Sequence, residues 1–474
     1  MRVFSRREFL GSAAGAVWAA GREWNIVLIL IDDLGWTDLG CFGSRFYRTP
    51  NIDRLASEGM RFTQAYSACT VCSPSRAAIL TGKYPARLHL TDWIAGHHYP
   101  WARLKPPDWT QYLPLEERTL AEALKPRGYR SASIGKWHLA PVQNGAGYYP
   151  DRQGFDLNVA GTYRGQPPSY FSPYGIETLT DGPPGEYLTD REESEALAFI
   201  EAHRKEPLLI YAPHHAVHNP VQAKKDTIAR YQSVADSLAP HHHAVYAAMI
   251  DHVDENVGRL RRKLRELDLD SRTVIIFTSD NGGLLNNTSN QPLRAGKGSA
   301  YEGGVRVPLI VHWPGVTRPG SACDVPVIGP DLYPTVLDMA GAAPAPGQVI
   351  DGVSLVPLLK SAGRRPAAWR RQDLFWHYPH YHPGGATPYS AVRSGDWKLI
   401  EFQEHERVEL YDLSHDVGES TDLASRLPQK AEELRNRLHR WREQVGAQLA
   451  LPNPDYDPAR AKRMSTRASF QVKD

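Results

Sequence analysis

Two pairs of oxygen-bearing side chains each follow directly after an apolar, β-branched run. Asp32 and Asp33 come after residues 25–31, and Asp280 and Asn281 come after residues 272–279. In open α/β sheets ligands bind at the carboxyl ends of the strands, so we expect these four side chains to meet at one edge. Because carboxylate and amide oxygens suit hard cations, the pattern predicts a Ca²⁺ site, with Mg²⁺ as the alternative. A lone Asp often caps a turn instead, which is a weaker explanation for two equivalent pairs.

A cysteine lies where a helix should begin. In the sequence CSPSR at residues 72–76, Ser73 is a good N-cap and Pro74 a good first helical residue. Cys72 would then lie at the positive end of the helix, where anionic groups are stabilised, with Arg76 one turn further on. Cys69 completes a Cys-x-x-Cys spacing, so a redox or metal pair is a competing interpretation. It is the weaker one, because a neighbouring hard-cation site does not favour thiolate ligands.

These residues resemble a known family signature. CSPSR at 72–76, followed by LTG at 80–82, is similar to the signature of the type I sulfatases, the arylsulfatase-like, formylglycine-dependent enzymes of the alkaline phosphatase superfamily. Similar blocks occur in family order at residues 32–36, 49–56, 135–139, 279–282, 296–298 and 302–308. The resemblance covers about residues 24–424 and implies a sulfuric ester hydrolase.

The resemblance implies a role for each matching residue. In this family a formylglycine-generating or an anaerobic sulfatase-maturating enzyme oxidises the cysteine to formylglycine, whose hydrated aldehyde is the nucleophile. The implied cation ligands are Asp32, Asp33, Asp280, Asn281 and the modified Cys72. The implied catalytic residues are Cys72 itself, Arg76 to orient the formylglycine, Lys136 and Lys297 to hold sulfate oxygens, His138 to take the proton of the aldehyde hydrate, and His218 to donate to the leaving group. His218 is chosen because it alone fits the family pattern His-x-Pro within HHAVHNP at 214–220.

This set of residues suits the hydrolysis of a sulfate ester. The reaction spreads negative charge over the sulfuryl oxygens, and the metal, Lys136, Lys297 and the helix N-terminus would supply fixed positive charge there. An unmodified thiol would leave a stable covalent intermediate. A geminal diol avoids this, because the second hydroxyl can collapse to expel sulfate once His138 has taken its proton.

Histidine and aromatic residues cluster in two loop-like stretches, near residues 93–103 and 376–382. Such loops at a strand-end crevice suit a sulfated carbohydrate, since sugar rings stack on aromatic faces and hydroxyls need fixed partners. The candidate substrate-binding residues are His97, His98, Arg103, His215, His377 and His382. The competing interpretation is that they pack the loops together.

The elements that must position these residues alternate along the chain. Apolar runs at 25–31, 207–212 and 272–279 predict buried parallel strands, and helical patterns occupy 119–125, 190–203, 243–267 and 326–340. We therefore predict an α/β fold with a large central, mostly parallel sheet flanked by helices. Strand-like pieces at 389–392, 397–402 and 408–413 and a helix at 428–449 predict a smaller C-terminal α+β domain, an antiparallel sheet plus a helix. The expected divisions are a catalytic domain at 22–345, the C-terminal domain at 346–451 and an extended tail at 452–474.

Residues 1–21 are expected to be an export signal. Paired arginines followed by Phe-Leu and a short apolar stretch resemble the twin-arginine signal, although Gly11 replaces the usual Lys. A frayed N-terminal helix is the alternative. The stretch is too short to span a bilayer and no other segment offers ~20 apolar residues, so we expect no integral membrane protein. These features predict a periplasmic or secreted bacterial protein with the twin-arginine export machinery as a partner.

Composition excludes several function classes. The 474 residues are 41% hydrophobic and 23% charged, which is typical of a globular protein and not of a disordered chain or coiled coil. The net charge is +2, with no basic surplus for binding nucleic acid. Since residues 1–21 contain three Arg and one Glu, the rest of the chain is neutral, and an anionic substrate must be recognised by a local cluster. Four cysteines cannot form a disulfide scaffold.

Two other functions stay open on the sequence. A phosphonate monoester or phosphodiester hydrolase is one, because relatives in the same superfamily share the metal site and sometimes the cysteine motif. A non-catalytic glycan-binding protein is the other, if Cys72 is never converted.

Overall fold

The computed structural model describes residues 23–238 and 243–461. The expected export signal, and the end of the expected tail at 462–474, lie outside the described residues.

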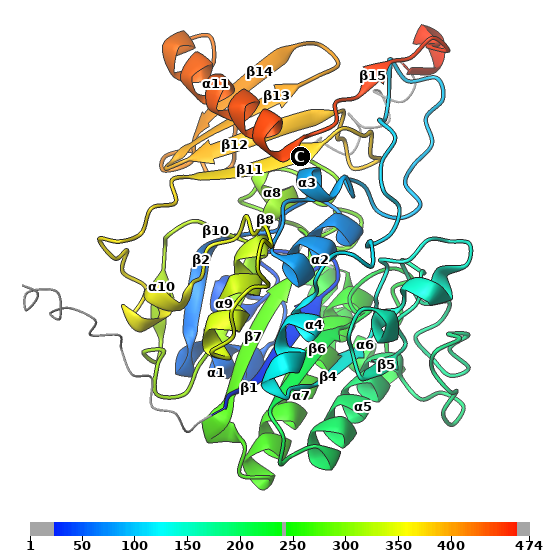
Figure 1. Ribbon diagram of the computed structural model, residues 1–474. Coiled ribbons are helices and arrows are strands. Elements are labelled where there is room, and N and C mark those ends of the chain that lie inside the picture. Colours follow the sequence, from blue (N-terminus) through cyan, green and yellow to red (C-terminus); the bar gives the residue numbers. More distant parts are fainter. Residues whose placement is uncertain (1–22, 239–242, 462–474) are drawn as a thin grey trace, which may run out of the picture.

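A nine-stranded mixed sheet forms the centre of the larger part of the protein (Figure 1). Its strand order is β10-β2-β8-β7-β1-β6-β4-β5, with β9 also pairing with β2. The strands are β1 (Asn25–Ile31), β2 (Met60–Tyr66), β4 (Arg130–Ile134), β5 (Leu157–Val159), β6 (Leu208–Pro213), β7 (Thr273–Ser279), β8 (Arg306–His312), β9 (Ser321–Cys323) and β10 (Val327–Ile328). Only β8 runs antiparallel to its neighbours, β2 and β7, so the predicted mostly parallel sheet is confirmed.

Strand β1 shows why the sheet is covered on both faces. All seven of its residues are buried, and alternate side chains enter two different cores because strand side chains point alternately to opposite faces. Val27, Ile29 and Ile31 join the core made with α1 (Pro50–Glu58), α5 (Leu188–Ala202), α6 (Lys225–Leu238) and α7 (Ala244–Glu266). The other core holds Ile26, Leu28 and Leu30 with α2 (Cys72–Thr81), α4 (Leu120–Leu124), α9 (Leu332–Met339) and α10 (Val356–Lys360).

A four-stranded antiparallel sheet with one long helix forms the C-terminal part, as predicted. Its elements are β11 (Asp373–Tyr378), β12 (Tyr389–Ser394), β13 (Trp397–Phe402), β14 (Arg407–Asp412) and α11 (Pro428–Val445). Helix α11 ends at Gly446, which takes the left-handed conformation (φ 66°) that favours glycine as a helix stop. The short elements α3 (Pro85–Leu88), α8 (Glu302–Val305), β3 (Leu104–Lys105) and β15 (Leu451–Pro452) complete the fold.

The structure corrects two details of the sequence interpretation. The expected helix at 326–340 begins only at Leu332, because Val327 and Ile328 pair with β2 and a 3-10 turn containing Pro330 separates them from α9. Ser73 is not the N-cap of α2, which begins at Cys72 after Val71. The Ser73 hydroxyl instead donates to the carbonyl of His138 at 2.9 Å and accepts from the Ile94 amide at 3.2 Å.

Candidate active site

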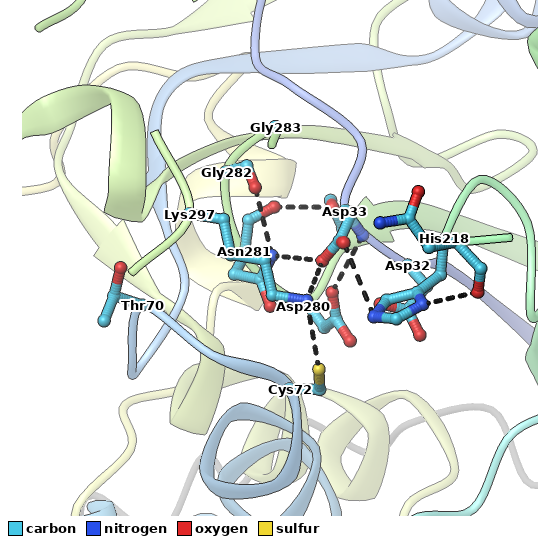
Figure 2. A network of polar contacts seen from close by, with 12 residues as sticks. Asp32, Asp33, Thr70, Cys72, His218, Asp280, Asn281, Gly282, Gly283 and Lys297 are labelled. Atoms are coloured by element: carbon cyan, nitrogen blue, oxygen red, sulfur yellow. Dashed lines mark hydrogen bonds and ion pairs between the residues drawn. The ribbon is translucent and has the colours of Figure 1, made fainter. Parts of the chain in front are cut away.

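The two carboxyl-end pairs meet because β1 and β7 are adjacent and in register. Ile31 lies opposite Ser279 in the parallel ladder, so the residues that follow leave the sheet side by side. The Asn281 amide donates to Asp33 Oδ1 at 2.8 Å, and the Asp33 backbone N–H lies 3.3 Å from Asp280 Oδ1. Figure 2 shows Asp33 between Asn281, Lys297 and His218, with Cys72 on the opposite side of the cluster.

Cys72 lies buried at the first turn of α2 and faces Lys297. The Lys297 ammonium is 3.5 Å from Cys72 Sγ. Burial raises the pKa of the Cys72 thiol above its ordinary value, although the charges of Lys136 and Lys297 oppose this. Burial also raises the pKa of Cys69. Both shifts are opposite to the lowered pKa of redox-active thiols, so the pair does not have the electrostatics of a redox site.

Three cations and three carboxylates are packed together below the sheet edge. Arg76 reaches two of the carboxylates, at 2.9 Å from Asp280 Oδ2 and 3.1 Å from Asp32 Oδ2. Lys136 forms an ion pair with Asp32, and Lys297 is 2.6 Å from Asp33 Oδ1. Burial alone would raise the pKa of Asp33, but Lys297 and then His218 hold that pKa below its ordinary value. The six formal charges cancel, so the protein itself carries no net charge at this point.

Three buried oxygens in this cluster have no hydrogen-bond donor. They are Asp32 Oδ1, Asp33 Oδ2 and Asn281 Oδ1. Buried polar atoms are normally satisfied, so three unpartnered oxygens close together fit the ligand set of a bound cation. Ligand atoms of Asp32, Asp33, Cys72 and His218 also lie within 4.8 Å of one another. The donor set, dominated by carboxylate and amide oxygens, fits a hard divalent cation.

His138 is arranged to accept a proton. Its Nε2 lies 2.6 Å from the Ile94 carbonyl, which can only accept, so Nε2 carries the proton and Nδ1 keeps its lone pair. Nδ1 is buried and has no partner. Burial, followed by the charge of Lys136, places the pKa of His138 well below its ordinary value, so the ring is neutral.

In the loop after β6, the side chain of His218 points in a different direction from those of His214 and His215. His218 Nε2 is 3.6 Å from Asp33 Oδ2, and its Nδ1 bonds the Asn219 carbonyl at 2.8 Å. Burial and then Lys297 lower the pKa of His218. His214 and His215 point away to share the buried carboxylate of Glu192 on α5, at 2.8 and 2.5 Å. His218 is therefore the histidine of this loop that faces the cluster.

A pocket of about 540 Å³ opens above the cluster. Of the predicted substrate residues, His97 and His382 line it, with ring centroids 5.0 Å apart. His98 and Arg103 are exposed and outside the lining, and His215 is held by Glu192. His377 is buried on β11, where it bonds Ser390 and the Gln448 carbonyl. The lining also includes residues that sequence reasoning missed, because neutral loop residues carry no signal: Gln166, Leu284, Leu285 and Asn286.

Comparisons with known proteins identify the family. The family model described as Sulfatase matches residues 24–342, two thirds of the chain. The chain belongs to the sulfatase family. A second model, "N-sulphoglucosamine sulphohydrolase, C-terminal", matches residues 296–446.

Relatives and solved structures agree with this sulfatase assignment. A sulfatase of Formosa agariphila is 33% identical over 500 aligned residues, covering 89% of each chain. Human arylsulfatase A is 34% identical, covering 88% of this chain and 86% of its own. The crystal structure of Ps i-CgsB in complex with k-i-k-neocarrahexaose superposes with a TM-score of 0.75 at 28% identity, over 94% of this chain and 98% of its own. The protein is thus a sulfatase enzyme, as the sequence motifs predicted.

The described part of this sulfatase contains no helix long and apolar enough to cross a membrane.

Proposed function

We propose that this sulfatase removes sulfate from a sulfated saccharide, using formylglycine made from Cys72 and a bound Ca²⁺. The observation that carries the proposal is the charge-neutral cluster with its three unpartnered oxygens, which lies beside Cys72 at the floor of the pocket. Asp32, Asp33, Asp280 and Asn281 would hold the cation together with the group at position 72.

The charge balance of the site supports a sulfate ester as substrate. Because three cations already balance three carboxylates, a bound divalent cation would leave a surplus of two positive charges. That surplus is equal in magnitude and opposite in sign to the charge of the inorganic sulfate released. The cation would polarise the sulfuryl oxygens when bound, and the aldehyde hydrate at position 72 would supply the attacking hydroxyl.

The other side chains of the site would then bind the sulfate group and transfer the protons. Lys136 and Lys297 hold sulfate oxygens as fixed donors that need no reorganisation when charge develops. Nδ1 of His138, which has no other partner, takes the proton of the hydrate. His218 donates a proton to the leaving oxygen, and Arg76 keeps α2 and the two aspartates in place through its bonds to Asp32 and Asp280.

The pocket walls support a saccharide as the group that carries the sulfate. Trp93, His97 and His382 form one wall, and Gln166, Asn219 and Asn286 contribute amides for hydroxyl groups. The complex of Ps i-CgsB with k-i-k-neocarrahexaose is consistent with this class.

Mass spectrometry and paired assays test the proposal. The peptide containing Cys72 should be about 18 Da lighter than its unmodified form, since –CH₂SH becomes –CHO. The Cys72→Ala variant should fold but not turn over sulfate esters, whereas Cys69→Ala, the matched control, should keep activity. Higher efficiency on a phosphate diester than on any sulfate ester, or activity in Cys72→Ala, would contradict the proposal.

Export and maturation belong to the same proposal. The twin-arginine pattern in residues 1–21 supports a periplasmic or secreted protein, and the motif around Cys72 supports maturation by a formylglycine-generating or anaerobic sulfatase-maturating enzyme. Replacing Arg6 and Arg7 by Lys should retain the protein in the cytoplasmic fraction. Unchanged export of that variant would exclude the twin-arginine route.

A further inference from the structure

The segment after α11 crosses back over the loop that carries the pocket wall. Residues 447–461 lie beyond both matching family models, which end at 342 and 446. In Figure 1 this segment, with β15, runs beside the loop that contains β3. We infer that residues 448–460, here called the strap, position the His97 wall of the substrate pocket, and that Asn453 is a specificity-determining positioning residue. The inference rests on the proposed saccharide substrate.

The strap forms hydrogen bonds with a continuous stretch of backbone in the loop. Leu451 and Pro452 pair antiparallel with Lys105 and Leu104. Nδ2 of Asn453 donates to the carbonyls of Pro100 at 2.8 Å and Ala102 at 2.6 Å. Backbone N–H groups of Asp457 and Asn453 donate to the carbonyls of Trp101 and Arg103, at 3.1 and 3.2 Å. The strap therefore binds all four carbonyls from Pro100 to Arg103, and a single side chain binds two of them.

A row of rings connects these carbonyls with the pocket. Trp101 packs on Tyr99 with centroids 6.1 Å apart, and Tyr99 stacks on His97 at 5.8 Å with an interplanar angle of 21°. His97 in turn accepts a hydrogen bond from Trp93 Nε1 at 2.9 Å, and both line the pocket. From the strap side, the Arg460 guanidinium lies 4.0 Å from the centre of the Trp101 ring. Movement of residues 100–103 would thus be passed to His97 through packed rings.

The loop needs this external support because it has little of its own. Between Trp93 and Gln111 its only regular element is the two-residue strand β3, and Ala95, His98 and Pro100 are exposed. Its first residues are held separately, since Ile94 bonds Ser73 and His138. The strap therefore supports the saccharide side of the pocket together with Tyr381, whose ring packs on Tyr99 and whose hydroxyl accepts from the Leu104 amide at 3.1 Å. The catalytic side is fixed by contacts within the core.

Substitutions at Asn453 in the full chain test this inference. Asn453→Ala removes both donors, and Asn453→Asp keeps the shape but sets a carboxylate against two carbonyls. Asp455→Asn is the matched control, because the Asp455 side chain is exposed and makes no hydrogen bond or ion pair with another described residue. Each protein is assayed on para-nitrophenyl sulfate and on whichever sulfated hexasaccharide of carrageenan, chondroitin or heparin the wild type cleaves fastest.

We expect both Asn453 variants to raise KM for the hexasaccharide by about three- to tenfold, which corresponds to the net loss of about one hydrogen bond, because the strap backbone still binds the Trp101 and Arg103 carbonyls. The kcat for the hexasaccharide and both constants for para-nitrophenyl sulfate should stay near the wild-type values, as should everything in Asp455→Asn. An unchanged hexasaccharide KM, or an equal rise for both substrates, would overturn the inference. Calorimetric titration of the same three hexasaccharides into proteins that also carry Cys72→Ala measures the effect of Asn453 on binding without turnover. A larger Kd in the Asn453 variants would support the inference even if the wild type is inactive, a result that would refute only the proposed function. An unchanged Kd, or no binding of any hexasaccharide, would refute the role of the strap.

Discussion

Replacing Lys297 by Met tests whether the buried charge cluster drives catalysis. The substitution keeps most of the side-chain volume and removes one positive charge that lies 3.5 Å from Cys72 Sγ and 2.6 Å from Asp33. At that distance, with an effective dielectric constant of about 20, a unit charge at the sulfur position interacts with the ammonium by roughly 5 kcal/mol. Removing a single preorganised donor to a developing oxyanion lowers the rate by a factor of about 10²–10³. That factor corresponds to an activation free energy of about 3–4 kcal/mol, which is less than the full interaction energy.

We therefore expect Lys297→Met to lower kcat/KM for para-nitrophenyl sulfate by about 10²–10³. The assay is run with saturating Ca²⁺, because a bound cation would also compensate Asp33 for its lost partner. Thermal unfolding of the same samples separates lost catalysis from lost folding, since breaking a buried ion pair costs about 3–5 kcal/mol when nothing replaces it. Lys83→Met is the matched control, as Lys83 pairs with Glu117 at 2.6 Å outside the pocket lining. A loss below about tenfold in folded Lys297→Met, or an equal loss in the control, would refute the electrostatic reasoning.

Three further predictions follow from the same geometry. Chelation should abolish activity and lower the melting temperature, and Ca²⁺ at 100 times its Kd should restore about 2.7 kcal/mol of stability; no change in either measurement would exclude a resident cation. Burial and Lys297 lower the pKa of His218, so its protonated form is lost as pH rises through a value below the ordinary histidine pKa of about 6.5. If His218 is the acid, kcat/KM should therefore begin to fall with rising pH below about pH 6.5, and the His218→Gln variant should not show this fall. Asp92 is buried between the Tyr378 hydroxyl and the Trp93 amide, and burial raises its pKa to about 7. The folded state therefore binds this proton more tightly than the unfolded chain does. Because of this difference, the free energy of unfolding falls as pH rises from about 4 to 7. Asp92→Asn should therefore be more stable than wild type at about pH 8 in urea unfolding, with a smaller difference at about pH 5; an equal difference at both would contradict the assignment.

The central strands and the meeting of the two oxygen-bearing pairs were predictable because the sequence signal there is strong. Residues 26–31 and 274–277 are apolar without interruption, and such runs are typical of strands buried on both faces. Because ligands bind at the carboxyl ends of such strands, the side chains that follow them were expected to meet at one edge. Arg76 and the two lysines carried no such local signal. They were located through the family blocks. The structure joins Arg76 to aspartates 44 and 204 positions away in the sequence, and it joins Lys136 to Asp32 and Lys297 to Asp33.

Other features could not be predicted because their causes lie in distant partners. Strand β11 contains Trp376 and His377, which as a sequence resemble an aromatic binding loop, and only pairing with β12 and the bond to Ser390 make it a buried strand. Ser73 has the chemistry of an N-cap, yet its hydroxyl bonds the carbonyl of His138. Glu192 on α5 decides that His214 and His215 turn away from the site, and nothing in the histidine motif indicates that carboxylate.

Under the proposed formylglycine mechanism, the burial of Cys72 limits when its side chain could be oxidised. The residue is only 2% exposed, at the base of a pocket and covered by α2 and the charge cluster. A second enzyme that oxidises this side chain needs the peptide in its own active site, which a residue enclosed in this way cannot enter. Conversion would therefore have to precede folding, so that the competition between the maturation enzyme and the closing fold sets the fraction of active molecules. A chain that folded first would be stable, correctly shaped and permanently without its nucleophile.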